Sequence, residues 1–213
     1  KMDYERKGGT SLERLIFPNI FPSKEISEKE LEKQFRISEQ ELRFLFVEEF
    51  LKDPNNGYYS VETPTENKYR FGKTNDDIKI DTLGKSASID MCIFKKDKDD
   101  NYIRSLNIEF KHSNASNKSI SKDILKLIHE KYNGAFVLLL KNTDSGSLKK
   151  VLDKFSTSFE IHKKHWCGES NKFIQLIIIS MELNKNKTAY IKYRKVFEKD
   201  LLTIKNNILS EWI

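Results

Sequence analysis

The segment 86–113 constrains the fold most, because two runs of alternating polar and apolar residues flank a short charged stretch. The apolar positions of the two runs are Ile89, Met91, Ile93, Leu106, Ile108 and Phe110. The stretch between the runs, K-K-D-K-D-D-N, is too polar for a core and suits a turn. Successive side chains of a strand point to opposite faces, so the segment is typical of a β-hairpin with one apolar face.

The other face of this hairpin gathers charged side chains. Asp90 lies on the polar face of the first run, and Glu109 and Lys111 lie on the polar face of the second. With a turn centred near residues 98–99, Asp90 lies opposite Asn107 and diagonal to Glu109, within reach of neighbouring-strand side chains. The hairpin therefore predicts a small site that holds two carboxylates and one ammonium group.

A helix upstream of the hairpin carries a further carboxylate. Ser38 and Glu41 form a capping-box pattern that opens a helix to Leu51. Its apolar stripe consists of Leu42, Leu45, Phe46 and Phe50. Glu49 falls inside this stripe and Glu48 near its border, and a carboxylate aimed at a core needs a partner, a metal or a proton. Two interpretations stay open: a slightly rotated helix lets Glu49 reach water, or the helix carboxylate, Glu49 or Glu48, points at the hairpin site.

The remaining segments alternate between strand and helix patterns. Strand character precedes the hairpin in segments 58–61, 68–71 and 78–81. After the hairpin, a helix capped by Ser119 or Ser121 runs to Tyr132, and the wholly apolar run 135–140 is typical of a strand buried on both faces. This order predicts a strand–helix–strand crossover.

Further elements complete a single domain. They are a short helix through Leu31 and Phe35, a helix from Ser145 or Ser147, a strand over 173–181 and a closing helix through Leu201 to Trp212. We expect residues 1–37 to form an N-terminal arm packed on one domain of residues 38–213, a length sufficient for one good core.

Composition narrows the class of protein. The chain has 38 Lys and Arg against 32 Asp and Glu, a formal charge of +6, which is compatible with an anionic partner without demanding one. Two cysteines are too few for a disulfide framework and suit a reducing cytosol. The longest apolar run, 173–181, is too short to span a bilayer. We therefore expect a cytoplasmic protein without membrane association.

The spacing of the charged residues resembles a known family. Asp90, eighteen further residues and then Glu109-Phe110-Lys111, with a glutamate in the preceding helix, resemble the PD-(D/E)XK nuclease superfamily over residues 38–140. The resemblance implies an α+β (α/β) restriction-endonuclease-like fold with an αβββαβ core, in which helices flank a mixed central sheet. Ile89 departs from the pattern, because it stands where the family name has a proline.

The resemblance also implies an activity. It predicts hydrolysis of nucleic acid, DNA in preference to RNA, by an endonuclease of a restriction or phage-defence type that depends on Mg²⁺ or Mn²⁺. Asp90, Glu109, the Phe110 carbonyl and Glu49 would hold the metal, and Lys111 would polarise the attacking water. A homodimer or a larger defence complex would suit such an enzyme. The alternative is a catalytically inactive nuclease fold that binds nucleic acid or protein.

Two basic segments are candidates for contact with nucleic acid. By resemblance, Lys122 or Lys126 on the helix after the hairpin would touch the scissile phosphate. In segment 184–195, tyrosines alternate with basic residues that include Lys192 and Arg194, a pattern that suits backbone and base contacts. The alternative for this second segment is a strand edge kept soluble by lysines.

Overall fold

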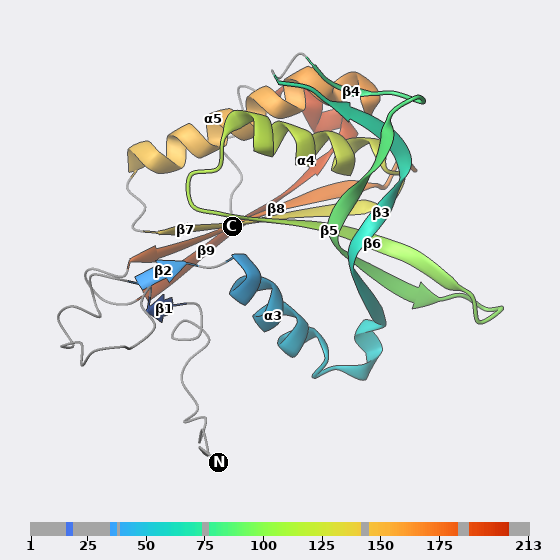
Figure 1. The fold of residues 1–213 in the computed structure, drawn as a ribbon, viewed down its shortest axis with the longest axis horizontal. Coiled ribbons are helices and arrows are strands. Elements are labelled where there is room, and N and C mark those ends of the chain that lie inside the picture. Colours follow the sequence, from blue (N-terminus) through green and yellow to red (C-terminus); the bar gives the residue numbers. More distant parts are fainter. Residues whose placement is uncertain are drawn as a thin grey trace.

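The computed structural model describes residues 16–18, 35–37, 39–73, 77–141, 145–182 and 188–204. A seven-stranded mixed sheet crosses this part of the chain in the order β4-β3-β5-β6-β7-β8-β9 (Figure 1). The strands are β3 (Tyr58–Phe71), β4 (Ile78–Ile80), β5 (Lys85–Lys96), β6 (Tyr102–His112), β7 (Asn133–Lys141), β8 (Phe173–Glu182) and β9 (Thr188–Phe197). Strands β6, β7 and β8 are parallel and the other neighbours pair antiparallel, so the expected mixed sheet of an α+β protein is confirmed.

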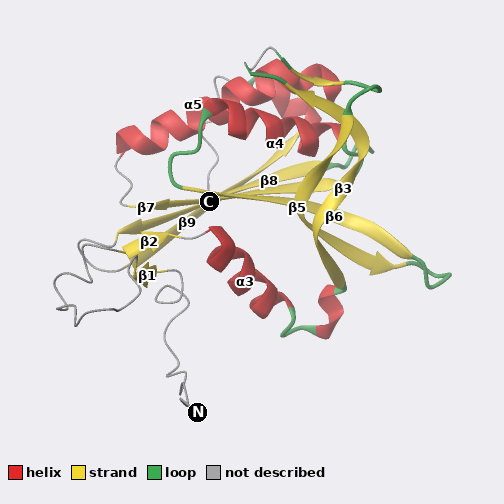
Figure 2. Cartoon of the chain, in the orientation of Figure 1, coloured by secondary structure: helices red, strands yellow, loops and turns green. Residues whose placement is uncertain are grey.

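Helices cover both faces of this sheet. Helix α3 (Glu39–Phe50) lies on one face, and α4 (Asn117–His129) and α5 (Ser145–His162) lie on the other (Figure 2). Within the described ranges, 3₁₀ helices span Pro54–Asn56, Lys163–His165 and Glu198–Leu202. In sequence order, α3, β3, β5, β6, α4 and β7 follow one another, with the 3₁₀ helix Pro54–Asn56 and the short strand β4 inserted. The predicted crossover from β6 through α4 to parallel β7 is confirmed.

Each face of the sheet has its own apolar cluster. On the α3 side, Leu42 packs with alternate residues of the hairpin and of β7: Met91, Ile93, Ile108, Phe110, Ala135, Val137 and Leu139. On the α4 and α5 side, the larger cluster includes Ile124, Phe136, Leu138, Phe155 and Ile178. The polar face of the hairpin therefore does not face water, since it lies on the side that α4 covers.

A β-bulge sets the register of the hairpin. Phe94 pairs with Arg104, but Ile93 already pairs with Leu106, so Ser105 is an extra residue in β6. Continued from the Met91–Ile108 pair, this register puts Asp90 opposite Glu109 instead of Asn107. Without the bulge, the Phe94–Arg104 register would put Asp90 on the apolar face, because a shift of one residue exchanges the two faces of a strand.

Some predicted boundaries differ from the structure. Helix α4 begins after Ser116, whose hydroxyl accepts the Ser119 N–H, and it ends at Glu130. The predicted C-cap at Asn133 and Gly134 is wrong, because both residues belong to β7. The early end has a tertiary cause: the buried Glu130 carboxylate accepts backbone N–H groups from the irregular part of β3, which fixes the chain at this point. The strands predicted at 58–61 and 68–71 are parts of one strand, β3.

The two ends of the chain are described only in part. The predicted helix through Leu31 lies outside the described residues, and Phe35 belongs to β2 (Phe35–Ile37), which pairs antiparallel with β1 (Ile16–Pro18). The division into an arm of residues 1–37 and one domain stays a prediction. The predicted closing helix lies outside the described residues beyond Ile204. None of the helices in the described ranges combines the length and the apolar character needed to cross a membrane.

The α5 side of the core supports a stability prediction. Phe155 is fully buried and packs edge-on against Phe136, with the ring centres 5.0 Å apart. Phe155→Ala should lower the free energy of unfolding by about 3–5 kcal/mol, because it removes contacts and leaves a cavity. The matched control, Phe44→Ala on α3, should change it by less than about 0.5 kcal/mol, since Phe44 is 65% exposed. Urea unfolding followed by circular dichroism measures both, and equal losses would contradict this core.

Candidate functional site

The candidate site begins where the pairing between β5 and β6 ends. The last paired residues are Met91 and Ile108, and the next outward N–H group, that of Phe110, donates to Asp90 Oδ2 at 2.7 Å. The Asp90 carboxylate thus takes the place of a strand carbonyl and is held between the two strands. Burial raises the pKa of Asp90, while the Phe110 N–H and the nearby Lys111 and Arg43 act in the opposite direction.

Glu109 lies deeper in the same place. Its side chain is fully buried, and Lys126 Nζ lies 2.5 Å from Glu109 Oε1. The second carboxylate oxygen, Oε2, is buried and has no hydrogen-bond partner among the described residues. Burial raises the pKa of Glu109 well above its ordinary value; the nearby Asp123 carboxylate raises it further, and the Lys126 ammonium offsets part of this effect.

Lys111 points to the same side of β6 as Glu109. Its ammonium group lies 3.0 Å from Asp123 Oδ2 and 4.0 Å from Asp90 Oδ2, and it donates to the Phe110 carbonyl at 2.9 Å. Burial lowers the pKa of Lys111, but the surrounding carboxylates outweigh burial and raise it overall. The site therefore keeps a protonated amine beside its carboxylates. The structure brings Asp90, Glu109 and Lys111 together, as the hairpin pattern predicts.

Helix α4 closes the site with a carboxylate and a second ammonium group. Asp123 and Lys126 stand three residues apart, on one face of α4, and pair at 2.9 Å. Lys126 also donates to the Ser88 carbonyl at 2.8 Å and is 6% exposed, so it lies inside the carboxylate cluster, and its contact with a scissile phosphate stays a prediction. Lys122 lies elsewhere, with its Nζ 4.8 Å from the centre of the Phe71 ring.

Helix α3 reaches the site through Arg43. The guanidinium group contacts three carboxylates: Asp90 at 2.8 Å, Glu39 at 2.8 Å and Glu62 at 2.9 Å. Glu62 holds a left-handed backbone conformation within β3, with φ of 48°, and accepts the Ser88 hydroxyl at 2.6 Å. A non-glycine residue adopts this conformation only when its surroundings impose it. Arg43 therefore links α3, β3 and β5 at the edge of the site.

Glu49 does not belong to this cluster, so the prediction that it converges with the hairpin carboxylates is wrong. Its side chain is 57% exposed and pairs with Lys52 at 2.5 Å. Phe46 packs edge-on against Phe110, and this contact turns Glu49 toward water. Six residues separate Arg43 from Glu49, about 9 Å along the helix axis. The glutamate of α3 that lies near the site is Glu39, and Glu48 is also exposed.

The two basic residues of β9 predicted to contact nucleic acid, Lys192 and Arg194, lie away from the carboxylate cluster or are buried. Arg194 is only 4% exposed, so it is not available on the surface as predicted. Lys192 is exposed on β9, at the end of the strand order, with β7 and β8 between it and β6. At the usual spacing of strands, β9 lies about 14 Å from β6. Lys192 is therefore remote from the carboxylates.

The sequence patterns do not predict four residues of the site, which are Glu39, Arg43, Glu62 and Asp123. One signal could have identified Asp123, because it interrupts the apolar positions of α4 next to Ile124. No comparable signal exists for Glu62, since its contact depends on a left-handed backbone conformation. Arg43 and Glu39 face the site only because α3 crosses the sheet with its N-terminal end at Asp90.

The donor types at the site are of the kind that a magnesium ion with few protein ligands would need. Among the described residues, no three or more His, Cys, Asp or Glu side chains are grouped so that they could hold one metal. Magnesium, however, needs only one or two carboxylates, with carbonyl oxygens, waters or substrate phosphates completing its shell. Asp90, Glu109 and the Phe110 carbonyl are donors of this kind, and Glu109 Oε2 is free of hydrogen bonds.

Negative charge exceeds positive charge in the site. The carboxylates are those of Glu39, Glu62, Asp90, Glu109 and Asp123, and the cations are Arg43, Lys111 and Lys126. An acidic surplus attracts a cation, and a bound divalent cation would in turn let a phosphate approach.

No protein-family model, curated protein or solved structure matches this chain, so any functional interpretation rests on the chemistry and geometry of these residues.

The burial of Lys126 supports a second prediction. Lys126→Met should lower the free energy of unfolding by about 3–5 kcal/mol at pH 8, because it leaves the Glu109 and Asp123 carboxylates buried beside only Lys111. Since the pKa of Glu109 is raised, its carboxyl group gains a proton as the pH falls and loses the charge that needs Lys126. The loss should therefore be smaller at pH 5 than at pH 8.

Urea unfolding at the two pH values measures this loss. The matched control is Lys122→Met on the same helix, which removes one cation–π contact and should cost about 0.5–1 kcal/mol at either pH. Equal losses for the two variants, or a Lys126→Met loss that grows toward pH 5, would contradict the described network.

Proposed function

We propose that this protein is a metal-dependent phosphodiesterase that hydrolyses nucleic acid, acting as a DNA endonuclease. The observation that carries the proposal is the convergence of Asp90, Glu109 and Lys111 at the end of the β5–β6 pairing, beside the Phe110 carbonyl. The element order α3, β3, β5, β6, α4 and β7 supports it, because it agrees with the αβββαβ core of the PD-(D/E)XK superfamily that the sequence resembles.

Asp90, Glu109 and the Phe110 carbonyl would hold the metal ion. When bound, Mg²⁺ or Mn²⁺ supplies charge neutralisation at the phosphate and an activated water near neutral pH. Asp90 suits this role because the Phe110 N–H fixes its orientation, so little conformational freedom is lost on binding. Glu109 offers an oxygen without a hydrogen-bond partner, and a cation there would relieve the cost of burying that oxygen.

Lys111 would act on the phosphate. Its side chain is 18% exposed, so it lies at the mouth of the site, and its raised pKa keeps it protonated. A fixed ammonium group near a reacting phosphate stabilises the negative charge that develops there and can orient the attacking water. Asp123 holds this ammonium group from the α4 side at 3.0 Å and limits its movement.

The resemblance supports further parts of the proposal. They are a restriction or phage-defence role, a cytoplasmic location, DNA in preference to RNA as substrate, and assembly as a homodimer or within a larger defence complex. These parts concern the biological role and the assembly of the enzyme, and they rest on analogy with other proteins of this fold. The residues of the site bear directly only on the reaction class.

One observation favours a second candidate function, a nuclease fold that binds nucleic acid or protein without cleaving it. Lys126 pairs with Glu109, and Arg43 pairs with Asp90, so protein cations already neutralise the two principal carboxylates. Such pairs can be purely structural, because buried charges persist when they are paired. This candidate predicts binding that is indifferent to magnesium.

Cleavage assays distinguish the two functions. With Mg²⁺ present, the wild-type protein should cut supercoiled plasmid, linear duplex, single-stranded DNA or RNA, and chelation should stop the cutting. Asp90→Asn, Glu109→Gln and Lys111→Met should each lower the rate by about 100-fold or more, because each removes a metal ligand or a charge that stabilises the transition state. Thermal melting of each variant shows whether it is folded.

The matched control is Glu160→Gln, an exposed residue of α5 that pairs with Lys163 at the surface. It should retain the wild-type rate. Cleavage that survives in both the Asp90→Asn and Glu109→Gln proteins would refute the assignment of the site. The absence of cleavage on all four substrates, with a melting temperature that magnesium does not change, would favour the binding module.

A further inference from the structure

Aromatic and cationic side chains from the β5–β6 hairpin, from the start of β3 and from the segment after α4 form a row that ends at a pocket. We name this set the cation–aromatic row; its members are Lys96, Tyr102, Tyr58, Phe94, Arg104, Tyr132 and Lys131. Lys96 Nζ lies 5.4 Å from the centre of the Tyr102 ring, and the Tyr102 and Tyr58 rings are 4.8 Å apart. The row thus begins with rings and an ammonium group in contact.

Arg104 connects the two halves of the row. Its guanidinium carbon lies 5.9 Å from the centre of the Phe94 ring and 5.5 Å from that of Tyr132. Lys131 Nζ lies 5.0 Å from the centre of the same Tyr132 ring. Cations at these distances are attracted to the ring faces, so the contacts hold the side chains in fixed positions.

The strand register explains why these residues share one face. Tyr58 and Arg104 both pair with Phe94, and Tyr102 pairs with Lys96 two residues further along β5. Directly paired residues of antiparallel strands point to the same face, as do residues two apart in one strand. In Figure 1 this end of the β5–β6 hairpin projects away from the helices. Tyr58 and Tyr102 are accordingly 47% and 58% exposed.

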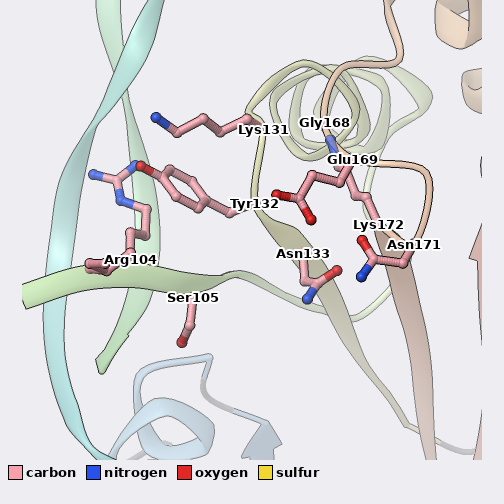
Figure 3. Close-up of a pocket in the computed structure, with 10 residues that line it drawn as sticks. Arg104, Ser105, Lys131, Tyr132, Asn133, Gly168, Glu169, Asn171 and Lys172 are labelled. Carbon is pink, nitrogen blue, oxygen red and sulfur yellow. The ribbon is translucent and has the colours of Figure 1, made fainter. Parts of the chain in front are cut away.

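The row ends in a pocket with a volume of about 530 Å³ (Figure 3). Arg104, Lys131, Tyr132, Asn133 and Asn171 line it, together with the carboxylate-bearing Glu169. The Arg104 side chain is only 10% exposed, yet its Nη1 atom has no hydrogen-bond partner, and the nearest carboxylate, Glu130, is 3.9 Å away. A buried guanidinium N–H group without a hydrogen bond is suited to donate to an anionic oxygen.

We propose that the cation–aromatic row binds single-stranded nucleic acid. Bases stack on the exposed rings of Tyr58 and Tyr102, and backbone phosphates bind Lys96, Lys131 and the free donor of Arg104. Every base has a π face, so such a surface binds without strong sequence preference. The bases of a duplex are already stacked on one another, so the same rings cannot engage them.

The charge balance of the hairpin tip makes stacking the larger contribution. Lys96 pairs with Asp100 at 2.7 Å and Lys131 pairs with Glu66 at 3.4 Å, and both pairs offset part of the attraction for phosphates. Arg104 and Glu109 lie opposite Phe94 and Asp90, which are four residues apart on β5, about 14 Å along the strand. The row is therefore separate from the carboxylate site, and its binding of single strands does not depend on whether that site cleaves them.

Fluorescence anisotropy in EDTA tests the row without cleavage. The probes are labelled 12-nucleotide single strands of DNA and of RNA and a DNA duplex of the same length, so the first two arms also show which sugar is preferred. We expect the single strands to bind at least about tenfold more tightly than the duplex. Tyr58→Ala and Tyr102→Ala should each weaken this binding by about 5- to 50-fold, and Tyr102→Phe should retain it because the ring remains.

The matched control is Tyr59→Ala, which changes the neighbouring residue on the opposite face of β3, where Tyr59 contacts Phe50. It should bind single strands as the wild type does. Glu160→Gln on α5 should also bind normally. Because the assay in EDTA reports binding without cleavage, a failure of the nuclease proposal and a failure of this one have different signatures. No binding by the wild type, equal affinity for the duplex, or unchanged affinity in both tyrosine-to-alanine variants would each overturn the proposal.

Discussion

The burial of charge between the β5–β6 hairpin and α4 is the constraint on which the rest of the structure depends. Glu109 is fully buried and Asp123 nearly so, and both would be very costly without cations. Lys126 meets this need by pairing with both carboxylates and with the Ser88 carbonyl. Because these partners lie on β5, β6 and α4, a shift of the helix by one turn would leave charges unpaired. The network thus fixes how α4 sits on the sheet, and the surrounding apolar contacts supply the stability.

Stability and chemistry make opposite demands on this cluster. A buried ion pair contributes little net stability, since the loss of hydration offsets the attraction between the charges. The two apolar clusters, one on each face of the sheet, therefore supply most of the stability of the fold. The buried charges of Glu109, Asp123 and Lys126 lie on the same face of the sheet as the larger cluster. The buried Glu109 Oε2 atom, which has no hydrogen bond among the described residues, lowers the stability of the folded protein further. Costs of this kind are typical of functional sites, where the arrangement is selected for chemistry.

Local patterns predict much of the fold, because alternation and apolar stripes follow from which faces are buried. The hairpin, the crossover helix and the strands over β7 and β8 are clear for this reason. Glu49 marks the limit of such patterns, because an apolar stripe fixes the rotation of a helix only within about one residue. The contact of Phe46 with Phe110 decides the rest. The cluster around Arg43 needs tertiary knowledge as well, since its three carboxylate partners come from α3, β3 and β5.

The bulge at Ser105 affects both the carboxylate site and the cation–aromatic row. In a regular strand, residues an odd number of positions apart point to opposite faces, so Arg104 and Glu109 would lie on different sides of the sheet. The extra residue reverses this parity, and both side chains face α4, where Arg104 approaches Glu130 and Glu109 meets Lys126. Bulges are frequent beside functional sites because they redirect a side chain without rebuilding the sheet. One inserted residue thereby places the carboxylate site and the cation–aromatic row on the same face of β6, about 14 Å apart, a span that one strand of nucleic acid could cover.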